Sequence, residues 1–257
     1  MPENKTDNIL RMPNRRTVAE DDPRGQLFQD LICAYHIIDL LGQPSGMGSH
    51  LTARLPGADT FLFHVHNFGF GEVTPELVHE ADFDLNVLTG DVAINPTLHI
   101  HTRMYLARPD VTCIVHTHAK HVSALSAIGQ NLEPVTQSAC RLHDDCVFFD
   151  EDDGVALGLG PGEAIARALG HRSALVLKNH GLLTVGRSIP EAVVLADTME
   201  SQAEIQLLAM AAGKLDLPSL EGRERSKNYL RSDKMIGRAW TTMMRQLARE
   251  RPEVLEM

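Results

Sequence analysis

Three histidines at the ends of apolar segments are the residues of this sequence best suited to bind a metal ion. His116 and His118 follow the apolar run 112–115, and His180 also comes directly after an apolar segment. Side chains two residues apart in a strand point to the same side, so the imidazoles of His116 and His118 can reach one cation. Gly181 allows a sharp turn and a close approach of a ligand to the backbone after His180. The pattern predicts a tri-histidine site for one divalent metal.

Short strands and longer helices alternate along the chain and must position these histidines. Hydrophobic periodicity, with Gly, Pro, Asn and Asp between segments, predicts strands at 50–55, 60–66, 91–94, 112–115, 147–150, 173–179 and 182–186. The same signals predict helices at 26–41, 97–107, 121–128, 161–170, 190–212 and 233–251. Helices before, between and after short strands favour a layered α/β/α domain around a mixed sheet.

Composition limits the classes of partner. The 257 residues carry a formal net charge of −10, which argues against nucleic acid or an anionic membrane as the main partner. No apolar run approaches the roughly 18 residues of a membrane span, and no secretory signal is recognisable, so a cytoplasmic location is expected. We predict a polar N-terminal arm at 1–24 and one domain at 25–257, with a C-terminal helical tail from about 214.

Four motifs give the sequence a family resemblance. IVHTHAKHVSALSAIG, LVLKNHGLLTVGRSIPEA, GSHLTARLPG and YLARPDV resemble segments of the class II aldolase/adducin family, and the resemblance runs from about Leu27 to Ala212. It implies a three-layer α/β/α sandwich around a mixed, largely antiparallel sheet. It also implies a homotetramer with active sites between subunits, and a divalent metal held by His116, His118 and His180.

The sequence departs from the sugar-phosphate aldolases of that family at three positions. Thr97 stands where those enzymes carry a metal-binding glutamate that moves protons, and threonine cannot act as a carboxylate base. His50 replaces a phosphate-binding asparagine, and Gln137 replaces a proton-donating tyrosine. Ordinary aldolase activity is therefore not expected. The combination resembles the non-phosphate branches, which include metal-dependent decarboxylases of aromatic acids and non-haem iron oxygenases of the aminocoumarin pathways.

Other polar residues are candidates for the chemistry around the metal. The predicted catalytic residues are His50, His101 and Thr97, and the predicted substrate-binding residues are Ser49, His50, Arg54 and Gln137. An imidazole at position 50 could bind a carboxylate. His101 could line the metal pocket or make a polar contact on its helix, and Arg54 could bind substrate or form a structural ion pair. His121 could orient a metal ligand.

Three functions remain open at this point. The first is a metal-dependent lyase or decarboxylase that breaks a C–C bond in a non-phosphorylated oxo- or hydroxy-acid. The second is a non-haem Fe(II) oxygenase acting on an aromatic 2-oxo or 2-hydroxy acid. The third is an adducin-like assembly module without catalysis, which the three retained histidines argue against. The expected cofactor is one divalent metal per chain, Zn, Fe(II) or Mn, and the expected partner is a small carboxylic acid.

Overall fold

A seven-stranded sheet forms the centre of the molecule in the computed structural model, which describes residues 22–43, 48–151 and 158–257. The strands are β1 (His50–Arg54), β2 (Thr60–His64), β3 (Val78–Asp82), β4 (Cys113–Thr117), β5 (Cys146–Phe149), β6 (Ala174–Leu177) and β7 (Gly181–Gly186). Their order across the sheet is β3-β2-β1-β4-β7-β6-β5. β5 pairs with β6 in parallel, and the other pairs are antiparallel.

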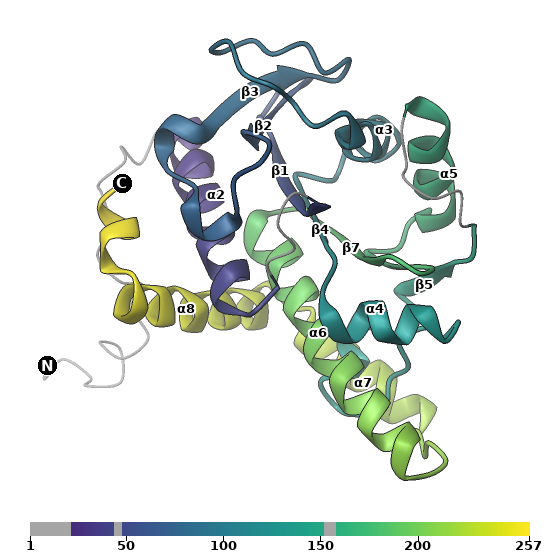
Figure 1. The fold of residues 1–257 in the computed structure, drawn as a ribbon. Helices are drawn as coiled ribbons and strands as arrows, with labels where there is room; N and C mark the ends of the chain where they lie inside the picture. The colour runs from purple at the N-terminus through teal and green to yellow at the C-terminus, as the bar shows by residue number, and fades with distance from the viewer. Residues whose placement is uncertain (1–21, 44–47, 152–157) are drawn as a thin grey trace, which may run out of the picture.

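Helices cover both faces of the sheet (Figure 1). They are α2 (Pro23–Leu40), α3 (His99–Ala107), α4 (Lys120–Ala127), α5 (Leu159–Leu169), α6 (Ile189–Ala212), α7 (Leu220–Leu230) and α8 (Asp233–Glu250). Local signals begin several of them: the Asp22 side chain accepts from the backbone N–H of Gly25 before α2, and Ser188 does the same for Glu191 in α6.

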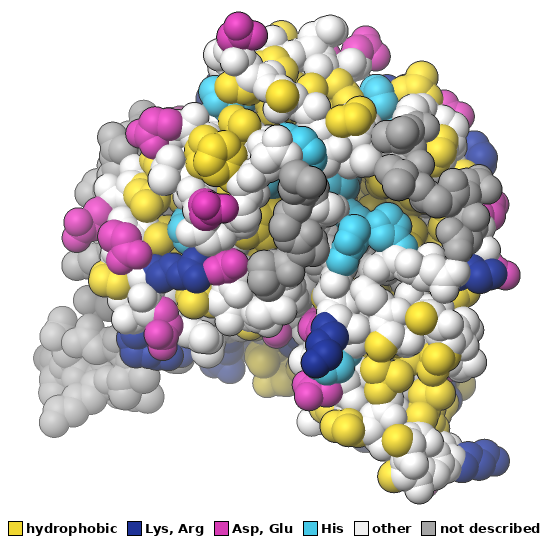
Figure 2. Space-filling view, in the orientation of Figure 1, with side chains coloured by type: hydrophobic (Ala, Val, Ile, Leu, Met, Phe, Trp, Pro, Cys, Tyr) yellow, Lys and Arg dark blue, Asp and Glu magenta, His cyan; other side chains and the backbone are white. Residues whose placement is uncertain are grey.

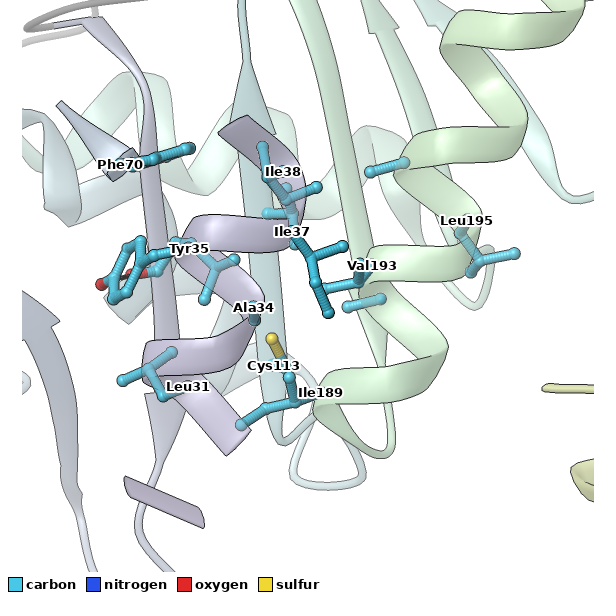
Figure 3. Packing of buried hydrophobic residues seen from close by; sticks show 14 of the residues in the cluster. Leu31, Ala34, Tyr35, Ile37, Ile38, Phe70, Cys113, Ile189, Val193 and Leu195 are labelled. Atoms are coloured by element: carbon cyan, nitrogen blue, oxygen red, sulfur yellow. Dashed lines mark hydrogen bonds between the residues drawn. The ribbon is translucent and has the colours of Figure 1, made fainter. Parts of the chain in front are cut away.

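The larger core lies between one sheet face and helices α2, α6 and α8. Leu51 of β1 and Cys113 of β4 project into it, and Figure 3 shows Ile37 of α2 beside Val193 of α6. The indole of Trp240 in α8 is also buried in this cluster. Residues after 214, expected to form a tail, thus include a helix that packs into the domain.

The second core lies on the opposite face, under α3 and α5. Phe61 and Phe63 of β2 and Ile114 of β4 pack there with Met104 and Tyr105 of α3. Because side chains alternate along a strand, His50 and Thr52 of β1 also belong to this face. The predicted three-layer sandwich is confirmed, and its second interface contains the polar residues of interest.

Several predicted boundaries were wrong. Residues 91–94 form no strand; Val92 and Ile94 lie in an irregular segment and pack against the second core. β3 was missed because only its first and fourth residues are buried, and α7 was missed because it has no buried residue. Pro23 and Arg24, assigned to the N-terminal arm, belong to α2. Asp22 of the arm caps this helix, and residues 1–21 lie outside the described part of the chain.

No helix among the described residues is both long enough and apolar enough to cross a membrane.

A buried histidine makes the stability of this fold sensitive to acid. The His64 ring lies 4.8 Å from the Tyr35 ring and 5.5 Å from the Phe70 ring, measured between centroids. Burial lowers the pKa of His64 to about 4. The unfolded chain therefore binds this proton more readily, and stability is lost as the pH falls from about 6.5 towards 4.

We predict that His64→Gln reduces this acid sensitivity. The free energy of unfolding of the unsubstituted protein should fall between pH 7 and pH 5, with up to about 2 kcal/mol of that loss coming from His64. Urea denaturation of both proteins at the two pH values measures the difference. His171→Gln, at an exposed position, is the control. An equal pH dependence in His64→Gln and the unsubstituted protein would contradict this assignment.

Candidate metal centre

The pairing of β1 with β4 sets the position of the first metal-binding candidate. His50 and His116 are directly opposite each other in this antiparallel pair, and their ring centroids lie 4.7 Å apart. His116 is buried, and its Nδ1 lies 2.7 Å from the carbonyl oxygen of Leu182 on β7. A carbonyl only accepts, so Nδ1 of His116 carries the proton and Nε2 presents its lone pair.

The three predicted ligands come together at the ends of β4, β6 and β7. The ligand nitrogens of His116, His118 and His180 all lie within 4.8 Å of one another. Nε2 of His118 and Nε2 of His180 are 2.7 Å apart, so both point to the same small volume. The ring centroids of His116 and His180 are 4.8 Å apart. His118 and His180 are partly exposed, and Figure 2 shows histidine side chains gathered at the surface.

Glycines make room for this cluster. A Cβ on Gly181 would lie 2.3 Å from the carbonyl oxygen of Thr117, so only glycine allows the chain after His180 to pass this close to β4. A Cβ on Gly48 would lie 2.6 Å from Cε1 of His118, so the backbone at Gly48 lies directly against the His118 ring.

Burial keeps the inner histidines neutral. The pKa values of His50 and His116 lie well below 6.5, first because burial disfavours the charged imidazole and second because neighbouring histidines repel it. Burial also lowers the pKa of His118. Neutral imidazoles are the form that binds a metal ion, so the residues present fit a divalent cation without prior deprotonation.

His50 and His101 are adjacent, but only His50 contacts the ligand cluster. Nδ1 of His50 lies 2.8 Å from Nε2 of His101, and Nε2 of His50 lies 3.1 Å from the hydroxyl of Thr97. His101 is fully buried between α3 and β1, behind His50. Thr97 lies in a short 3-10 helix (Pro96–Leu98) that precedes α3.

The substrate-binding candidates lie in different places. Ser49 is beside His50, and its buried hydroxyl has no hydrogen-bond partner among the described residues. Arg54 is at the other end of β1, about 13 Å of strand away, where it pairs with Asp59 and its guanidinium lies over the ring of Phe83. Gln137 is exposed on a turn before the 3-10 helix Ala139–Leu142. Ser49 therefore adjoins His50 in the chain, whereas Arg54 and Gln137 lie away from the cluster within one chain.

His121, considered as a partner of a metal ligand, has a structural contact instead. Its Nδ1 and its backbone N–H both lie within hydrogen-bond distance of the Glu200 carboxylate in α6. The same carboxylate accepts from the backbone N–H of Val122. Glu200 thus satisfies the free amides at the start of α4, as an N-cap does.

Two residues that were not predicted for the site, Thr52 and Tyr105, contact the predicted ones. The Thr52 hydroxyl lies 2.7 Å from Nδ1 of His101 and 2.7 Å from the hydroxyl of Tyr105. The sequence does indicate two polar faces. One is formed by His50 and Thr52, two residues apart in a strand, and the other by His101 and Tyr105, four residues apart in a helix.

Comparisons with known proteins agree with this architecture. A family model described as "Class II Aldolase and Adducin N-terminal domain" matches residues 29–207. The chain is 31% identical over 211 residues to the decarboxylase NovR of Streptomyces niveus, covering 79% of this chain and 78% of that protein. It is 32% identical over 189 residues to a 4-hydroxy-3-prenylphenylpyruvate oxygenase/4-hydroxy-3-prenylbenzoate synthase of Streptomyces roseochromogenus subsp. oscitans, covering 72% and 68%.

Among solved structures, the chain is similar to an L-fuculose 1-phosphate aldolase from Glaciozyma antarctica PI12. The TM-score is 0.85 at 25% sequence identity, and the match covers 99% of this chain and 100% of that chain.

We predict that Gly181→Ala weakens metal binding. The added methyl group must displace the chain carrying His180 from Thr117, which separates two of the three ligands. Zinc affinity, measured by competition with a chelator, should fall about tenfold or more, equivalent to about 1.4 kcal/mol. Gly160→Ala is the matched control, because a Cβ at that position meets no atom within 4 Å. Unchanged affinity in Gly181→Ala would contradict the role given to this glycine.

Proposed function

Because the chain belongs to the class II aldolase and adducin family, we propose that it is a metal-dependent enzyme that breaks a C–C bond next to a carboxylate or carbonyl group. The observation that carries the proposal is the convergence of His116, His118 and His180 within 4.8 Å. No carboxylate joins this group among the described residues. A bound divalent ion would act as a Lewis acid towards the carboxylate or carbonyl oxygen of the substrate.

The residues around the three histidines favour a decarboxylase over a sugar-phosphate aldolase. Thr97 offers a hydroxyl where an aldolase of this family would offer a glutamate, so the site has no strong base at that position. Loss of carbon dioxide needs no base in the cleavage step. It is favoured by a hydrogen-bond donor that holds the substrate, and the N–H of a neutral imidazole is such a donor. His50 is placed for this role, since its ring lies 4.7 Å from that of His116.

The substrate we propose is a non-phosphorylated oxo- or hydroxy-acid. Ser49 supports this choice, because it directly precedes His50 in the chain and its buried hydroxyl has no partner in the described part of the chain. A carboxylate could accept a hydrogen bond from it. The name of the oxygenase relative contains an aromatic 2-oxo acid, 4-hydroxy-3-prenylphenylpyruvate, so aromatic 2-oxo acids are the first compounds to test.

A non-haem iron oxygenase is the second candidate, and the oxygenase relative favours it. Three neutral imidazoles are a variant of the facial triad of two histidines and one carboxylate, and leave positions open on the metal. Both candidates use the same site and the same class of substrate. They differ in whether oxygen is consumed. The choice among zinc, iron(II) and manganese follows from that difference.

The homotetramer implied by the family resemblance stays a prediction. Exposed apolar side chains that would suit a subunit contact occur on α6 (Leu208, 66% exposed) and on α7 (Tyr229, 59% exposed). These two helices project from the rest of the molecule in Figure 1, and Figure 2 shows apolar side chains gathered over that projection.

The deciding experiment measures carbon dioxide release and oxygen uptake together. Protein loaded separately with Zn, Mn or Fe(II) is given phenylpyruvate and related aromatic 2-oxo acids, with and without oxygen. A lyase releases carbon dioxide equally well under both conditions. Oxygen uptake in proportion to turnover, with Fe(II) alone, would replace the lyase by the oxygenase.

His50→Gln tests the role of the second histidine in the same assay. Loss of a positioned hydrogen-bond donor should lower kcat by about 10²–10³-fold, with metal content unchanged. His171→Gln, at an exposed position, should keep full activity. Full activity in His50→Gln would remove His50 from the mechanism, and absence of any turnover in metal-loaded protein would favour a non-catalytic assembly module.

A further inference from the structure

A chain of buried polar groups lies behind His50, between β1 and α3. His50 and Thr52 are two residues apart on the strand, and His101 and Tyr105 are four residues apart on the helix. A two-residue step in a strand covers about 6.6 Å and a four-residue step in a helix about 6 Å. The two pairs therefore match in spacing and interleave. All four side chains are buried, with at most 3% of any residue exposed.

The contacts in this chain are continuous. Nδ1 of His50 lies 2.8 Å from Nε2 of His101, and Nδ1 of His101 lies 2.7 Å from the Thr52 hydroxyl. The Thr52 hydroxyl lies 2.7 Å from that of Tyr105. On the other side of His50, its Nε2 lies 3.1 Å from the Thr97 hydroxyl.

Asn95 accepts a hydrogen bond from Thr97 at one end of this series of contacts, and that bond determines the direction of all the others. The Thr97 hydroxyl donates to Oδ1 of Asn95 at 2.8 Å, and the same oxygen accepts from the backbone N–H of Thr97. A hydroxyl has one proton, so the oxygen of Thr97 must accept from Nε2–H of His50. A neutral imidazole has one N–H, so Nδ1 of His50 must in turn accept.

The same count continues along the chain. His101 donates from Nε2 to His50, so Nδ1 of His101 accepts from the Thr52 hydroxyl. The oxygen of Thr52 then accepts from the Tyr105 hydroxyl. Tyr105 has one other acceptor, the carbonyl oxygen of Thr112, at the much longer distance of 3.5 Å. Each side chain in the series donates one proton to one acceptor. The rings of His50 and His101 are therefore both held with the proton on Nε2.

We propose that His101, Thr52 and Tyr105 are positioning residues that hold His50 in the tautomer with its proton on Nε2, facing Thr97. Both nitrogens of His50 are then occupied, one as an acceptor and one as a donor. His50 therefore does not become a fourth metal ligand, although its ring is beside that of His116. It offers an N–H to the substrate instead, with Thr97 as the acceptor when substrate is absent. This role for His50 rests on the function proposed above.

The tautomers can be observed directly in the full-length protein. Long-range ¹H–¹⁵N spectra of zinc-loaded protein with ¹⁵N-labelled histidine report which ring nitrogen carries the proton. His50→Gln and His101→Gln assign the two signals. The proposal expects the proton on Nε2 in both rings. A proton on Nδ1 of His50, or zinc bound to His50, overturns it whatever the behaviour of the variants.

Thr52→Val and Thr52→Ser test whether the chain causes this state. Valine has nearly the shape of threonine but cannot donate to Nδ1 of His101, so the single tautomer of both rings should become a mixture. Serine keeps the hydroxyl and should restore the single tautomer. One zinc per chain in each variant shows that the site is still folded. Spectra of Thr52→Val identical to those of the unsubstituted protein would refute the role of Thr52.

Tyr35→Phe is the matched control. Tyr35 is also fully buried against β1, but on the opposite face, where its hydroxyl donates to the carbonyl oxygen of Leu51. The Tyr35→Phe variant loses a buried phenol hydrogen bond of the same kind and should leave the tautomers of His50 and His101 unchanged. Tyr105→Phe, in contrast, should shift the His101 signals. These spectra need no turnover, so failure to find an enzymatic reaction would count against the proposed function and not against the tautomer.

Discussion

The antiparallel pairing of β1 with β4 is the constraint on which the rest of the site depends. It places His50 directly across from His116 and brings the polar residues of β1 to the face covered by α3. β7 pairs with the other side of β4, and its Leu182 carbonyl holds the tautomer of His116. A shift of one residue in either pairing would turn His116 or its neighbours to the opposite face, where α2 and α6 form the apolar core.

Burial and hydrogen bonding then divide similar side chains into different roles. His116 is tied to a carbonyl through Nδ1, which leaves Nε2 as a ligand. His50 is tied through both nitrogens, which leaves it as a donor. His101 is farther from solvent and acts on His50. The pKa values of His50, His101 and His116 all lie well below 6.5, chiefly because of burial. Their roles therefore depend on which nitrogen carries the proton.

The convergence of three histidines could be predicted from the sequence because its signals are local. An apolar segment followed by HTH, and another followed by His-Gly, place His116, His118 and His180 near strand ends without knowledge of the sheet order. The neighbours of His50 could not be predicted in the same way. Its contact with His116 depends on strand register, and its contact with His101 depends on how α3 lies on the sheet, both of which are long-range.

The errors in the fold have a similar cause. β3 is an edge strand with only two buried residues, and α7 has none, so neither shows the periodic apolar pattern that a local reading needs. Residues 91–94 have that pattern but lie in an irregular segment, because burial of Val92 and Ile94 does not require a strand. Of the two alternatives stated for Arg54, substrate binding or a structural ion pair, its contact in the structure is the ion pair with Asp59 at the far end of β1, and a role in substrate binding stays a prediction.

X-ray absorption spectroscopy of the zinc-loaded protein tests the central claim most directly. The account predicts three imidazole nitrogens at about 2.0–2.1 Å and a remaining position filled by oxygen from water. The imidazole count should fall in His116→Ala and stay at three in His50→Gln. A fourth imidazole that disappears in His50→Gln, or sulfur among the ligands, would contradict a site built from His116, His118 and His180 alone.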